Sequence, residues 1–137
     1  MMKKVTLILL TGLILSACNK DNVRVENVEL LGKWKLIEQL SDPGDGSGVF
    51  KSVESEKTIE FMDDGTVVSN GTLCTMTIEK GQESVGTYAI GDGYIIPEGC
   101  DYSELKVFFE LKDKNLILGY LCFEGCGQKF VKLNNRD

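Results

Sequence analysis

Five cysteines carry the most reactive chemistry in this chain of 137 residues. A thiol can be acylated, ligate a metal, act as a nucleophile or form a disulfide. Four of the five, Cys74, Cys100, Cys122 and Cys126, allow three disulfide pairings. The three residues between Cys122 and Cys126 end in Gly125, and such a loop would place the two cysteines opposite each other across a hairpin. This geometry favours Cys122–Cys126 and leaves Cys74–Cys100, while the other pairings stay open.

A four-cysteine zinc site is the alternative for these residues. It requires close cysteine pairs and a reducing compartment, so we expect disulfides and no metal. A glycine-rich loop over residues 42–48 contains Asp42 and Asp45, but it lacks the alternating ligands and terminal Glu of a calcium-binding loop. We interpret it as a mobile loop.

The sequence offers little for catalysis. It contains no histidine, so the commonest general base and the commonest transition-metal ligand are both missing. It has no Gly-x-Ser-x-Gly motif, phosphate-binding glycine loop or dinucleotide fingerprint. We therefore expect no enzymatic activity and no cofactor.

Glu38 is a candidate ligand-binding residue. It shares the period-two spacing of Trp34, Leu36 and Leu40, so perfect alternation would point its carboxylate into the interior of a barrel. A buried carboxylate must be paired, protonated or in contact with a wet cavity, where it could orient the polar head of an apolar ligand. The alternative is a bulge or strand end that returns Glu38 to solvent, and this alternative is favoured.

The N-terminus has the pattern of an export signal. Two lysines precede an apolar run over residues 5–15. This run is too short to cross a bilayer, which requires about 20 apolar residues, but it fits a secretory signal segment. Small residues at positions 16 and 17 then precede Cys18.

The stretch Leu15-Ser16-Ala17-Cys18 resembles the lipobox of bacterial lipoproteins, which are cleaved before the cysteine. The resemblance implies a signal peptide over residues 1–17, acyl chains on Cys18 that attach the protein to a membrane, and a tether over residues 18–29. Asn19 is compatible with transport to the outer membrane in lipoproteins of this type, so we expect a place in the bacterial cell envelope. A soluble secreted protein cleaved near Ala17 is the alternative.

Charge narrows the range of partners. The chain has 15 basic and 21 acidic residues, and removing residues 1–17 would take away two of the lysines. No basic stripe is present to displace counterions from phosphates, so a nucleic-acid partner is not expected. The same acidic excess disfavours docking on anionic lipid, so attachment to a membrane would depend on the acyl chains of Cys18.

Residues 30–137 have the pattern of one all-β domain. Short alternating segments are predicted as strands and are separated by turn residues such as Asp63-Asp64-Gly65 and Gly91-Asp92-Gly93. A strand is also predicted from Leu73 to Ile78. Eight or nine short antiparallel strands in this length predict a small up-and-down barrel of about eight strands, or a sandwich.

Three motifs of this domain resemble lipocalin-like proteins, in particular the small lipoproteins of Bacteroidota. They are Gly32-Lys33-Trp34 at the first strand, the hairpin Phe61-Met62-Asp63-Asp64-Gly65, and the late strand Leu116-Ile117-Leu118. The resemblance implies an up-and-down barrel that binds a small apolar molecule. Trp34 is expected to close one end of the barrel with its indole.

Two functions follow as expectations. In the first, a lumen holds a small apolar ligand, because eight strands can enclose one. In the second, large side chains fill the barrel and its outer surface or loops bind a protein or glycan of the envelope. Phe61, Tyr88, Phe109 and Phe130 are large enough to fill so small a barrel.

Overall fold

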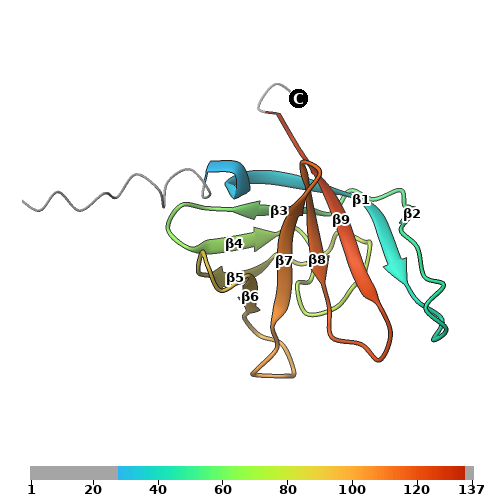
Figure 1. Cartoon of the computed structure of the whole chain (residues 1–137). Helices are drawn as coiled ribbons and strands as arrows, with labels where there is room; N and C mark the ends of the chain where they lie inside the picture. The colour runs from blue at the N-terminus through green and yellow to red at the C-terminus, as the bar shows by residue number, and fades with distance from the viewer. Residues whose placement is uncertain (1–27, 135–137) are drawn as a thin grey trace, which may run out of the picture.

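The computed structural model describes residues 28–134, and these form a β-barrel. A helical turn at residues 28–30 precedes the first strand (Figure 1). The strands are β1 (Gly32–Ser41), β2 (Lys51–Ser52), β3 (Thr58–Phe61), β4 (Thr66–Ser69), β5 (Ser84–Tyr88), β6 (Tyr94–Pro97), β7 (Val107–Lys112), β8 (Asn115–Gly119) and β9 (Cys126–Lys132). Within the described range, no helix is both long and apolar enough to cross a membrane.

The strands form a closed antiparallel meander. Neighbours along the chain pair with each other from β3 to β9, and β1 pairs with β9 to close the sheet. Residues 32–35 of β1 pair with β3, and Glu38 and Gln39 pair with β2. Because β9 occupies the other edge of β1, the short strand β2 and β3 share one place around the barrel. Nine strands therefore occupy eight positions, which confirms the predicted all-β, eight-stranded antiparallel up-and-down barrel.

Side chains from the strands fill the interior. Alternate residues point inward, as the burial patterns of β3, β4 and β8 show. Phe61, Tyr88 and Phe109 pack edge to face, with ring centroids 5.0–6.2 Å apart. Full burial of one large apolar side chain contributes roughly 1.5–3 kcal/mol. The buried apolar side chains form one cluster: Leu30, Trp34, Leu36, Ile59, Phe61, Val67, Leu73, Tyr88, Ile95, Val107, Leu116, Leu118 and Phe130.

A β-bulge in β1 changes which side chains face the interior. The register against β9 runs from Leu36↔Phe130 to Glu38↔Lys129, so Ile37 is the extra residue. Before the bulge Leu36 points inward, and after it Glu38 points outward. The carboxylate of Glu38 forms an ion pair with the ammonium of Lys129 on the outer wall. The structure therefore has the bulge that the sequence favoured.

The two ends of the barrel differ. At the end near residue 28, strands are joined by tight connections: residues 62–65, 89–93 and 113–114. Trp34 lies inside this end, 2% exposed, and its indole nitrogen donates a hydrogen bond to the carbonyl of Leu30 at 2.9 Å. The ammonium of Lys132 lies 5.2 Å from the centre of the indole ring. The indole thus closes this end, as the sequence predicts, and the helical turn covers it.

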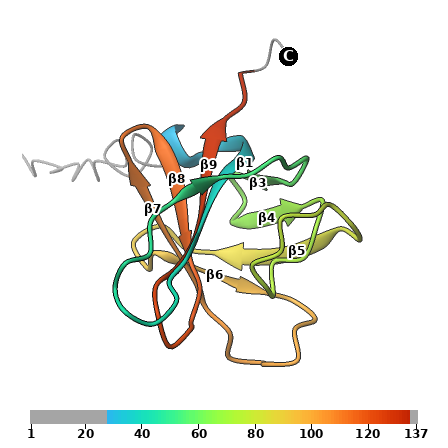
Figure 2. The same ribbon diagram turned by 90° about the vertical axis from the view of Figure 1, so that its right-hand side faces the viewer.

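Four long loops lie at the opposite end, which we call the long-loop end. They are residues 42–50, 70–83, 98–106 and 120–125 (Figure 2). The strand predicted from Leu73 to Ile78 is wrong, because this segment belongs to the second of these loops and has no strand pairing. Leu73 is buried and Ile78 is half-buried for a different reason: the loop folds into the mouth of the barrel.

Candidate functional site

The segment at residues 73–78 seals the mouth of the barrel at the long-loop end. Leu73 is fully buried, and Ile78 packs against the apolar cluster. Polar side chains of the barrel wall hold the segment through its main chain. The hydroxyl of Ser55 donates a hydrogen bond to the carbonyl of Ile78, and Lys57 and Gln128 both donate to the carbonyl of Thr77.

These polar side chains are themselves buried. Gln128 is fully buried and donates a second hydrogen bond, at 2.9 Å, to the side-chain oxygen of Gln39. The hydroxyl of Tyr120 donates to the side-chain oxygen of Gln128, and burial raises the pKa of Tyr120. Every buried side-chain nitrogen and oxygen in the described residues has a hydrogen-bond partner. Such a satisfied network fixes one arrangement of the segment.

Lys57 is the unusual member of this network. Its side chain is 1% exposed, and its ammonium donates to the carbonyl of Thr77 at 2.9 Å. Burial lowers the pKa of Lys57 from 10.5 to about 8. The two ion pairs of the described residues join other lysines, Lys35 with Glu56 and Lys129 with Glu38, so Lys57 carries its charge in the interior against a neutral carbonyl.

Two disulfides brace the long-loop end. Cys74–Cys100 joins loop 70–83 to loop 98–106, with 5.5 Å between the Cα atoms. Cys122–Cys126 closes the last hairpin, with 6.1 Å between the Cα atoms. These are the two bonds that the sequence favoured. Within residues 28–134, no group of three or more His, Cys, Asp or Glu side chains is placed to hold a metal ion.

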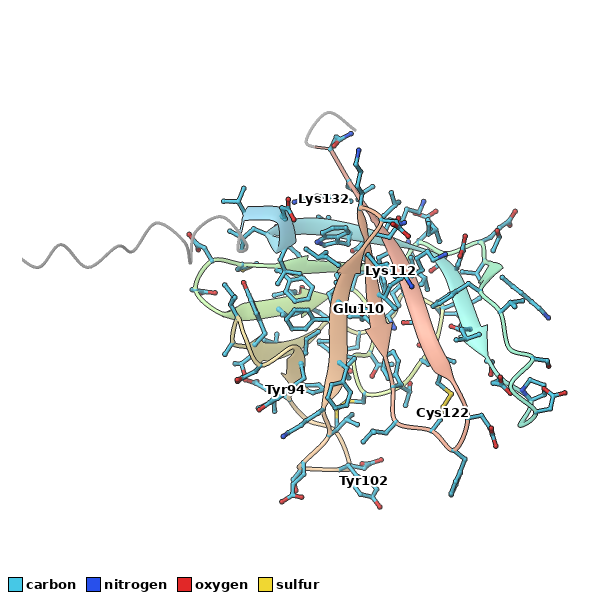
Figure 3. The ribbon with its side chains drawn as sticks, in the orientation of Figure 1. Tyr94, Tyr102, Glu110, Lys112, Cys122 and Lys132 are labelled. Carbon is cyan, nitrogen blue, oxygen red and sulfur yellow. A yellow bond between two sulfur atoms is a disulfide. The ribbon has the colours of Figure 1, made fainter. Side chains whose placement is uncertain are left out.

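Apolar side chains are exposed beside these disulfides. Tyr102 is 79% exposed, Leu121 is 71% exposed, and Phe123 is fully exposed. Tyr102 and Leu121 line a groove of about 360 Å³, together with the Cys74–Cys100 disulfide, Leu105 and Asp101. Figure 3 shows Tyr102 and Cys122 at this end and Lys132 at the other. We call Tyr102, Leu121, Phe123 and the groove the loop-end patch.

Carboxylates are concentrated in the same loops. The four long loops contain eight acidic residues and two lysines, Lys80 and Lys106. The ammonium of Lys106 lies 4.3 Å from the centre of the Tyr94 ring, on the outer wall of the barrel. The loop-end patch therefore lies in a negative field that the neighbouring cations only partly offset.

Loop 42–50 is held by one of these carboxylates and is better ordered than the sequence suggests. One oxygen of Asp42 accepts hydrogen bonds from the amides of Gly44, Asp45 and Gly46, at 2.8–3.2 Å. Its other oxygen accepts one from the amide of Gly48 at 2.8 Å. These bonds hold the pKa of Asp42 below its usual value. The carboxylate of Asp42 therefore holds the loop in one conformation.

The other candidate residues lie apart from the loop-end patch. Glu38 is on the outer wall, paired with Lys129, and does not face the interior. Cys18, the signal at 1–17 and nearly all of the tether at 18–29 lie outside the described residues. Sequence reasoning missed Lys57, although a signal for it existed: Lys57 has the parity of Ile59 and Phe61, which marks it as inward-facing.

Comparisons with known proteins do not assign this chain to a family. No protein-family model, curated protein or solved structure matches this chain significantly.

Proposed function

We propose that this protein is a lipid-anchored, non-catalytic protein of the bacterial envelope whose barrel presents the loop-end patch to another molecule. The observation that carries the proposal is the asymmetry of the barrel. All four long loops, both disulfides and the exposed Tyr102, Leu121 and Phe123 lie opposite the end at which residue 28 enters. Binding residues concentrate on loops held by a rigid scaffold. Exposed aromatic side chains on a braced surface are typical anchors of interfaces.

The filled interior supports this function over a ligand inside the barrel. Trp34, Phe61 and Phe130 are each at most 2% exposed and occupy the lumen. The segment at residues 73–78 seals its mouth. A small apolar ligand remains the second candidate, and its place would be the groove beside Tyr102 and Leu121, whose volume lies at the low end of the range for ligand pockets.

Lipid attachment is tested by labelling cells with radioactive palmitate. We expect the full-length protein to incorporate the label and to partition with membranes, and Cys18→Ala to do neither. Label on Cys18→Ala, or none on the wild type, would contradict the anchor. Cys122→Ala together with Cys126→Ala is the matched control and should keep the label.

Presentation of the loop-end patch is tested by photo-crosslinking in living cells. A photoreactive amino acid replaces Phe123 in one protein and Lys112 in another. Both side chains are exposed, but Lys112 lies at the end of β7 near the entry of the chain (Figure 3). We expect a discrete adduct from position 123 and none from position 112. Equal adducts from both positions, or none from position 123, would contradict the proposal.

A further inference from the structure

The loop-end patch also carries information about the chemistry of its partner. Its centre is apolar: Tyr102 and Leu121 are exposed and line the groove, and the fully exposed ring of Phe123 follows Leu121 by two residues in the same loop. Patches of this kind on a soluble domain mark binding sites more often than chance exposure. An apolar side chain is the group that such a groove takes from water most favourably.

The surroundings of the groove are acidic. Asp101 lines it, and Glu98 and Glu104 belong to the same loop. Glu124 follows Phe123 in the next loop. The four loops carry an excess of six negative charges, so this end holds an acidic excess as large as that of the whole chain. Such a field attracts cations and repels phosphates.

We infer that the loop-end patch binds a polypeptide segment that presents an apolar side chain flanked by lysine or arginine. This inference rests on the proposed function and names the class of its partner. Opposite charges around an apolar contact set the orientation of the partner and speed its association. Nucleic acid and anionic lipid are disfavoured by the same field.

The loops are already held in place in the free protein. We therefore expect the partner to be a short linear segment that binds without reordering them. Lys57 and Gln128 fix loop 70–83 from below through the carbonyl of Thr77, and Cys74–Cys100 fixes it to loop 98–106. A surface that is already ordered loses little conformational entropy on binding. The cost of ordering then falls mainly on the partner segment.

The test measures binding of short synthetic peptides to the full-length protein in detergent, by fluorescence anisotropy. One peptide has a leucine flanked by lysines, and a second has the lysines replaced by glutamates. A neutral oligosaccharide is the third probe. We expect saturable binding of the lysine peptide, at least about tenfold tighter than that of the glutamate peptide, and weaker at high salt. No binding of the lysine peptide, equal binding of the two peptides, or preference for the oligosaccharide would overturn the inference.

Matched variants locate the binding. Asp101→Lys should weaken binding of the lysine peptide about tenfold, and so should Phe123→Ala. The controls change exposed side chains on the outer wall of β7, as Glu110→Lys and Phe108→Ala, and should leave binding within about twofold. Equal losses in loop and wall variants would overturn the inference. If cross-linking from position 123 persists in cells while the peptides fail, the proposed function stands and the partner class is wrong.

Discussion

The ammonium of Lys57 donates a hydrogen bond to the carbonyl oxygen of Thr77 at 2.9 Å, from a side chain that is 1% exposed. This contact joins the barrel wall to the loop that seals it. A buried ammonium is costly unless hydrogen bonds offset its lost hydration. The contact therefore makes the stability of the sealed mouth depend on pH.

The direction of this dependence follows from the pKa values of Lys57. Its pKa is about 8 in the folded protein and 10.5 when exposed, as in the unfolded chain. Between these values the unfolded chain binds more protons than the folded protein, so stability rises with pH across this window. Below pH 8 both states are protonated, and the burial cost is present in full.

Lys57→Met removes this cost together with its pH dependence. We expect its free energy of unfolding to exceed that of the wild type at pH 7, and the difference to shrink by about 3 kcal/mol as pH rises past 10.5. Urea unfolding at several pH values measures it. Lys51→Met changes an exposed lysine and should follow the wild type at every pH. A constant difference between Lys57→Met and wild type would refute the assignment.

The disulfides should differ in their contribution to stability. Cys74–Cys100 spans 26 residues of chain and Cys122–Cys126 spans four. In the chain-entropy account, a longer closed loop restricts the unfolded chain more, by about 1.5 kcal/mol for these two lengths. We expect replacement of Cys74 and Cys100 by serine to lower the free energy of unfolding more than the same change at Cys122 and Cys126.

The Cys74–Cys100 variant should also lose binding at the loop-end patch, because the bond forms part of the groove. Amide hydrogen exchange at residues 73–83 should rise in this variant and stay unchanged in the other. Equal destabilisation by the two double substitutions would argue that strain or residual structure, and not loop length, sets their contributions.

The period-two alternation of apolar residues predicted most of the strands, and the exceptions depend on contacts between residues far apart in the sequence. The bulge at Ile37 depends on how β1 meets β9, and this contact spans about ninety residues of sequence. Residues 73–78 have a strand-like composition, but Lys57 and Gln128 donate hydrogen bonds to the carbonyl of Thr77, and the segment pairs with no strand. The loop-end patch could not be predicted either, since Tyr102 and Leu121 belong to different loops that come together only when the barrel closes.

Asp42 should control the order of loop 42–50. Its carboxylate is stabilised in the charged form by four amides, so its folded pKa lies below 3.8. The resulting stability is present above pH 3.8 and is lost as pH falls through the lower folded value. We expect Asp42→Ala to speed exchange of the amides of Gly44, Gly46 and Gly48 at neutral pH, measured by NMR.

A matched change nearby is Glu54→Ala, which removes an acidic side chain outside the loop and should leave these amides protected. Gly48→Ala offers a second check, because an added Cβ would meet Asp42 at 2.7 Å. It should loosen the loop as much as Asp42→Ala. Unchanged protection in both loop variants would show that the loop is held by other contacts.

The hairpin between β7 and β8 should gain stability from a change of one residue. Asp113 and Lys114 both have positive φ, 51° and 64°, in a two-residue turn. A lysine held in the left-handed region destabilises the folded protein by about 1 kcal/mol relative to glycine, because glycine adopts this conformation without a steric penalty. The greater freedom of glycine in the unfolded chain offsets part of this gain, so Lys114→Gly should raise the free energy of unfolding by roughly 0.5 kcal/mol in urea titrations. Lys112→Gly, two residues earlier at the end of β7, should lower it instead, because glycine is unfavourable in a strand. The opposite signs of these two neighbouring substitutions separate the effect of the turn from the loss of a surface charge, and equal signs would refute it.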